Sequence, residues 1–90
     1  MTRANLLISG RVQGVWYRAS TRDVATKHGI KGWVRNLPDG RVEAMLEGDQ
    51  TSVQKVIDWC RQGPPGALVT EVEVTWSEAS GEFPSFSVVR

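Results

Sequence analysis

The sequence predicts an α+β domain in which two helices pack on one face of an antiparallel sheet. Ninety residues are enough for one domain, spanning 1–90, and too few for a cofactor domain beside a substrate domain. With 40% hydrophobic and 23% charged residues, the composition is that of a globular protein and not of a disordered chain. Segments of twofold and of helical periodicity alternate along the chain, and neither a linker nor a repeat interrupts them.

The first third of the chain is predicted to form a strand, a helix and a second strand. Twofold alternation favours a strand over residues 6–12, and helical spacing favours a helix over 17–28. Gly29 is placed where a glycine commonly ends a helix. Residues 31–36 contain Trp33 and form a short strand. The predicted inner face of the helix consists of Tyr17, Thr21, Val24, Ala25 and His28.

The middle of the chain is predicted to form a turn, a strand and a second helix. Residues 37–40, Leu-Pro-Asp-Gly, contain the residue types that favour a turn. In the strand that follows, we expect Val42, Ala44 and Leu46 to point inward and Arg41, Glu43 and Glu47 outward. Thr51 and Gln54 fit a capping box at the start of the second helix, before residues 63–66 end it. Its apolar stripe consists of Val53, Val56, Ile57 and Cys60.

The last third is predicted to form two strands. Leu68, Thr70, Val72, Val74 and Trp76 share one face of the clearest strand in the sequence, and residues 83–89 suggest a short final strand. The order is strand–helix–strand–strand–helix–strand with one further C-terminal strand. This order predicts the ferredoxin-like α/β sandwich, which hosts many functions and decides none of them.

Charge and cysteine content exclude several function classes. A net charge of +1 gives no bulk attraction to nucleic acid or to anionic membranes, and no apolar run approaches the roughly 20 residues of a membrane helix. Cys60 is the only cysteine and His28 the only histidine, which excludes a disulfide framework and a cysteine or histidine metal cluster. Without a signal segment, we expect a reducing, cytoplasmic compartment.

The segment from Gly10 to Arg18 asks for a functional explanation. A strand runs through a glycine-containing loop directly into a helix, whose first N–H groups have no partner within the helix. Such a helix start binds anions, and an anion would offset the unfavourable position of Arg18 in the first turn. The alternative is a simple connection with a solvated Arg18. The glycine spacing matches neither a Walker loop nor a dinucleotide fingerprint.

Two stretches of the sequence resemble the signatures of the acylphosphatase family. Residues 10–18 read Gly-Arg-Val-Gln-Gly-Val-Trp-Tyr-Arg and resemble its G-x-V-Q-G-V-x-[FY]-R motif. Residues 32–43 resemble its G-[FYW]-V-x-N-x-x-[DN]-G-x-V-E motif, and the similarity runs nearly end to end. Trp16 and Tyr17 stand where many members have Phe or Gly.

This resemblance implies an acylphosphatase, which hydrolyses the carboxyl–phosphate bond of small acyl phosphates without a metal, a cofactor or a covalent intermediate. By position in the motifs, Arg18 is the phosphate-binding arginine and Asn36 the residue that orients the attacking water. The implied phosphate cradle consists of Gln13, Gly14, Val15, Trp16, Tyr17 and Arg18. Together with the charge and cysteine content, this leads us to expect a cytoplasmic monomer that has no nucleic-acid or membrane partner.

Alternatives remain open for single residues and for the whole chain. Asn36 can also serve simply to start the turn, and His28 and Cys60 are better explained as structural residues. Trp59 and Trp76 are expected to be partly buried packing residues. RNA-recognition modules share the predicted element order, but their aromatic motif is missing after Trp33. A regulatory domain that binds an anion without turning it over is the other alternative.

Overall fold

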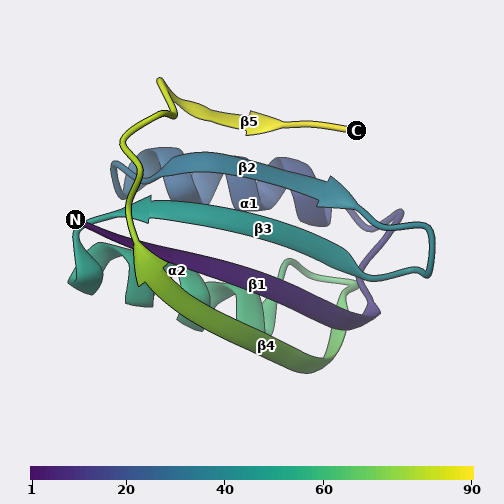
Figure 1. Cartoon of the computed structure of the whole chain (residues 1–90). Coiled ribbons are helices and arrows are strands. Elements are labelled where there is room, and N and C mark those ends of the chain that lie inside the picture. The colour runs from purple at the N-terminus through teal and green to yellow at the C-terminus, as the bar shows by residue number, and fades with distance from the viewer.

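The computed structural model describes all residues, 1–90, as one five-stranded sheet covered by two helices (Figure 1). The strands lie in the order β4-β1-β3-β2-β5. The elements in chain order are β1 (Thr2–Arg11), α1 (Tyr17–Lys27), β2 (Lys31–Asn36), β3 (Val42–Gly48), α2 (Gln50–Gln62), β4 (Leu68–Glu78) and β5 (Phe86–Val88). The predicted ferredoxin-like fold class is confirmed, and no helix is long and apolar enough to cross a membrane.

The sheet is mixed, whereas the sequence predicted an antiparallel one. The pairs β1–β4, β1–β3 and β2–β3 are antiparallel, but β5 pairs parallel with β2 through Gly32, Trp33 and Val34. This arrangement arises because the chain leaves β4 at one edge of the sheet and returns along the other edge (Figure 1). The final strand keeps only three of the seven residues predicted for it.

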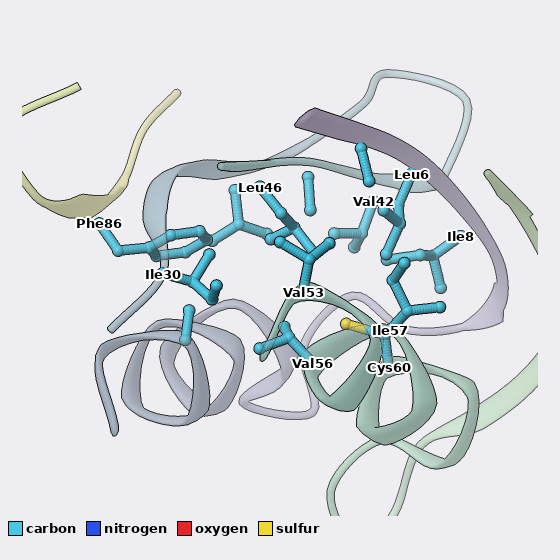
Figure 2. Packing of buried hydrophobic residues seen from close by; sticks show 14 of the residues in the cluster. Leu6, Ile8, Ile30, Val42, Leu46, Val53, Val56, Ile57, Cys60 and Phe86 are labelled. Atoms are coloured by element: carbon cyan, nitrogen blue, oxygen red, sulfur yellow. The ribbon is translucent and has the colours of Figure 1, made fainter. Parts of the chain in front are cut away.

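The core lies between the sheet and the two helices. Figure 2 shows the predicted stripe of α2 pointing toward apolar residues of β1 and β3. Of the predicted inner face of α1, Tyr17, Thr21 and Ala25 are buried, while Val24 and His28 are half-buried. The residues labelled in Figure 2 are Leu6, Ile8, Ile30, Val42, Leu46, Val53, Val56, Ile57, Cys60 and Phe86.

Helix α1 is followed by the predicted glycine, whereas α2 begins earlier than predicted. Gly29 has φ 69° just after α1, and Ile30 donates its N–H to the carbonyl of Ala25 at 2.9 Å, as in a Schellman motif. The capping box at Thr51 is wrong. Asp49 is the N-cap of α2, and its carboxylate accepts from the N–H of Ser52 at 3.2 Å.

Strand β4 follows the predicted alternation only in part. A register shift skips Thr70 between the pairs Ser9–Glu71 and Gly10–Val69. Val69 therefore packs against the core, whereas Leu68, which pairs with Arg11 of β1, is 63% exposed. Trp76, predicted to be partly buried, is 42% exposed. Because β4 is an edge strand with no residue in the fully buried core, its apolar residues tolerate this exposure.

Glu47 is buried, although its position in β3 predicted an outward-facing charge. Its side chain points away from the helices, as predicted, but the connection between β4 and β5 covers it on that face of the sheet. Its carboxylate accepts from the N–H groups of Ser80 and Gly81 at 2.8 and 3.1 Å and from Nε of Arg3 at 2.6 Å. Burial would raise the pKa of Glu47, but these donors outweigh burial and lower it.

Candidate active site

The loop between β1 and α1, residues 12–16, is held to the core at two points. Val12 is buried, and Val15 packs against the core cluster. Between and after them, Gly14 has φ 75° and Trp16 has φ 64°, both in the left-handed region. Glycine adopts this conformation freely, whereas for Trp16 it costs about 1–2 kcal/mol. Strain of this kind gathers at functional sites, where the surrounding structure maintains it.

The start of α1 carries a run of backbone donors that have no acceptor in the protein. None of the hydrogen bonds within the chain uses a backbone N–H of residues 13–19 as its donor. Trp16 occupies the N-cap and supplies no side-chain acceptor, and the first turn contains no acidic residue. Free N–H groups and the positive end of the helix dipole make this turn able to bind an anion.

Arg18 adds a full positive charge to the same place. It is the second residue of α1 and half-buried, and it forms neither an ion pair nor a hydrogen bond with another residue. A cation in the first turn of a helix is unfavourable by about 0.3–1 kcal/mol, and no carboxylate of this chain offsets that cost. A bound anion would do so, and the planar guanidinium can bond two oxygens at once.

Arg18 lines a cavity of about 360 Å³ at the N-terminal end of α1. Its wall is partly apolar, and its only charged residues are Arg18 and Arg22. Trp16 stands at its edge with 82% of its surface exposed. The remaining lining residues are Val12, Gly14, Tyr17 and Ala19, together with Val88 of β5. Of the predicted cradle, Gln13 and Val15 do not line the cavity.

Tyr17 fixes α1 against α2. Its hydroxyl donates a hydrogen bond to the carbonyl of Cys60 at 2.6 Å. In a continuing helix, the N–H four residues later would donate to this carbonyl, but that residue is Pro64, which has no N–H. Burial is the main cause that raises the pKa of both groups, to about 12 for the Cys60 thiol and higher still for the phenol of Tyr17. Both stay protonated at neutral pH, and neither can act as a base there.

Asn36 is the last residue of β2, and its side chain takes no part in the turn that follows. The turn is closed by backbone bonds between Leu37 and Arg41 at 2.8 Å and between Gly40 and Leu37 at 3.1 Å, and Asp39 accepts from the N–H of Arg41 at 3.0 Å. The turn-starting alternative for Asn36 therefore finds no support in the structure.

The side-chain oxygen of Asn36 is the one buried side-chain polar atom without a hydrogen-bond partner in the protein. A buried acceptor left unpaired costs about 1–3 kcal/mol. Such groups are commonly satisfied by an ordered water or a ligand. The side-chain oxygen of Asn36 is thus free to accept a hydrogen bond from a small molecule.

Gln13 connects the loop to the turn after Asn36. Its side-chain Nε2 donates to the carbonyl oxygens of Leu37 at 2.8 Å and of Arg41 at 2.9 Å. The prediction that the first loop and the end of the second strand lie at the same end of the sheet is confirmed by these bonds. The sequence placed Gln13 in the phosphate cradle only, and no local signal could have shown that its side chain reaches 24 residues along the chain.

Other conspicuous residues do not line this cavity. His28 ends α1 at its opposite end, and Cys60 is buried in the core as predicted. Trp33 is half-buried, with the guanidinium of Arg35 lying 5.1 Å from its ring centre. No group of three His, Cys, Asp or Glu side chains lies close enough together to hold a metal ion.

Known proteins resemble this chain over its whole length. Residues 4–88 match the acylphosphatase family. An acylphosphatase from Pyrobaculum arsenaticum is 57% identical over 99% of this chain and 95% of its own length, and one from Methylococcus capsulatus is 54% identical over 100% and 98%. The crystal structure of acylphosphatase from Bacillus subtilis superposes with a TM-score of 0.97 at 36% identity and covers both chains completely. The chain therefore belongs to the acylphosphatase family and is a hydrolase that acts on acyl phosphates.

Proposed function

We propose that the loop from Gln13 to Tyr17 and the guanidinium of Arg18 bind the phosphoryl group, while Asn36 orients the water that attacks phosphorus in line. The observation that carries this proposal is the set of free N–H donors of residues 13–19 beside the unpaired Arg18. The reaction breaks the bond between phosphorus and the acyl oxygen. It yields a carboxylate and inorganic phosphate, without a metal ion.

The chemistry asks little of the protein beyond positioning and charge. The leaving group is a carboxylate, which departs without protonation by a general acid. The transition state of phosphoryl transfer is loose and spreads negative charge over the equatorial oxygens. Arg18 and the preorganised N–H groups stabilise that charge, and one donor of this kind is commonly worth about 3–4 kcal/mol.

Asn36 suits the attacking water because its amide is neutral. Its buried Oδ1 accepts a hydrogen bond from the water and aligns a lone pair of the water oxygen with phosphorus. A carboxylate in this place would be repelled by the phosphate dianion. The proton of the water passes to a phosphate oxygen of the substrate, since the phenol of Tyr17 and the thiol of Cys60 both have raised pKa values.

Hydrolysis of benzoyl phosphate in excess EDTA tests the residue roles. Arg18→Ala should lower kcat/KM by a hundredfold or more, because it removes the charge that the transition state needs. Asn36→Ala should lower mainly kcat. Lys31→Ala is the matched control, since it removes an exposed cation at the far end of β2. Circular dichroism establishes that each variant is folded.

Three results would contradict parts of the proposal. If folded Arg18→Ala or Asn36→Ala matches Lys31→Ala in kcat/KM, the assigned roles are wrong. If EDTA abolishes the activity of the wild type, the metal-free reaction is wrong. A pH–rate profile supplies the third test, because a requirement for a deprotonated enzyme group near neutral pH would exclude the substrate phosphate as proton acceptor.

We propose further that the enzyme works as a monomer in the cytoplasm. The loop, Arg18 and Asn36 come from one chain, so that no second copy is needed to complete the site. The only thiol, Cys60, is free and buried, which suits a reducing compartment. Light scattering of the purified protein at micromolar concentration and cell fractionation test the two statements.

A further inference from the structure

Arg22 is the second cation of the cavity, and the proposed reaction leaves it without a role. It lies four residues after Arg18 on α1, so that the two side chains start about 6 Å apart along one face of the helix. Like charges at this spacing destabilise a helix by about 0.2–0.5 kcal/mol. No acidic residue lines the cavity to offset them.

The one ion pair of Arg22 is weak. Its Nε lies 3.4 Å from the carboxylate of Asp23, and the two side chains are 47% and 72% exposed. Adjacent residues on a helix do not face each other, and exposed pairs contribute little. The guanidinium of Arg22 is therefore available to a ligand that enters the cavity beside Arg18.

The spacing of the two arginines along α1 fits one class of acyl phosphate. When Arg18 holds the phosphoryl group, the acyl chain extends into the same cavity. A carboxylate two carbon atoms beyond the acyl carbonyl lies roughly 6 Å from phosphorus, which is five bonds of about 1.5 Å in extended form. That length matches one turn of α1. A carboxylate also presents two oxygens in one plane to the fork of a guanidinium.

We propose that Arg22 is a specificity-determining residue that binds a carboxylate on the acyl group, so that the enzyme prefers monoacyl phosphates of short dicarboxylic acids over neutral acyl phosphates. The proposal rests on the assignment of the phosphoryl group to Arg18. It also explains why the cavity joins two cations to an apolar wall, since the methylene groups between the two anionic ends lie against Val12 and Ala19.

A pair of matched substrates tests the proposal. Succinyl phosphate and butanoyl phosphate have the same four-carbon acyl chain and differ only in a terminal carboxylate or methyl group. In the wild type, we expect the ratio of kcat/KM for succinyl phosphate to that for butanoyl phosphate to exceed one. Arg22→Gln should lower this ratio about tenfold, mainly through KM, and Arg22→Lys should restore part of it.

The control is Lys27→Gln, which removes one positive charge from the last turn of the same helix, away from the cavity. A wild-type ratio of one or less, or an equal fall of the ratio in Lys27→Gln, overturns the proposal. Failure of the underlying assignment looks different. If Arg18→Ala leaves the hydrolysis of butanoyl phosphate unchanged, the phosphoryl group is not bound by Arg18, whatever the ratio.

Discussion

The side chain of Gln13 is expected to hold the two halves of the active site in register. Its Nε2 forms the only side-chain hydrogen bonds between the loop before α1 and the turn after β2. Gln13→Ala removes both bonds and leaves the fold of each segment intact. We therefore expect a loss of stability together with a loss of alignment between Arg18 and Asn36.

The size of the stability loss follows from the two acceptors. A neutral hydrogen bond contributes about 0.5–1.5 kcal/mol net, which gives roughly 1–3 kcal/mol for two. The lower half of that range applies here, because each carbonyl keeps a second donor: Leu37 accepts also from Gly40, and Arg41 accepts also from Leu37. A loss of about 1–2 kcal/mol lowers the Tm of a 90-residue domain by roughly 5–15 °C.

The catalytic loss is expected to be larger than the stability loss would suggest. Displacement of reacting groups by about 1 Å can cost a hundredfold in rate, so that kcat for benzoyl phosphate should fall at least tenfold at a temperature where the variant is fully folded. Urea unfolding gives the first quantity and steady-state kinetics the second. KM should change less than kcat, because Arg18 and the free N–H groups are untouched.

Gln54→Ala is the matched control for Gln13→Ala. It also removes a glutamine amide, which donates to Asp58 at 2.9 Å on the exposed face of α2. That exposed i,i+4 bond is worth only about 0.2–0.5 kcal/mol. If Gln13→Ala is as stable and as active as Gln54→Ala, the reasoning about the link between loop and turn is refuted.

Two further substitutions test the packing that supports the site. Glu47→Gln should destabilise the protein by about 2 kcal/mol at pH 7, because it weakens the charge-assisted bonds to the β4–β5 connection. The pKa of Glu47 is lowered in the folded protein, so the stability that its carboxylate contributes is complete above the unfolded pKa of about 4.3 and is lost as pH falls through the folded pKa. In urea unfolding, the difference in the free energy of unfolding between wild type and Glu47→Gln should therefore shrink in acid. A difference that does not change with pH contradicts this reasoning. Tyr17→Phe should cost about 1–3 kcal/mol in urea unfolding, because the carbonyl of Cys60 loses its donor and Pro64 cannot replace it; a cost near zero would mean that water reaches that carbonyl.

Local signals predicted those parts of the fold that depend on neighbours in sequence. The bounds of β2, the buried stripe of α2 and the glycine after α1 all depend on residues a few positions apart. The start of α2 is the exception. Asp49 and Thr51 both have capping side chains, and the structure uses Asp49 because the helix begins directly as β3 ends.

Features that depend on distant contacts could not be predicted in this way. Glu47 alternates correctly with its neighbours, and its burial depends on a connection more than 30 residues later. Likewise, Leu68 fits the alternation of β4, but the pairing of β4 with β1 skips Thr70, and this register shift turns Leu68 outward. In both cases the local pattern is right and the partner decides the outcome.

The loop before Arg18 and the turn after Asn36 lie at one end of the sheet because of strand direction. Strands β1 and β2 are each antiparallel to β3, which lies between them, and they therefore run in the same direction. Hence the segments that follow them, the loop before α1 and the turn after Asn36, lie at the same end of the sheet (Figure 1). Strand direction brings the loop and the turn close enough for a side chain to connect them, but it does not fix their exact position relative to each other. The side chain of Gln13 joins them directly, which is why a residue that touches neither phosphorus nor water in the proposed reaction is expected to affect kcat.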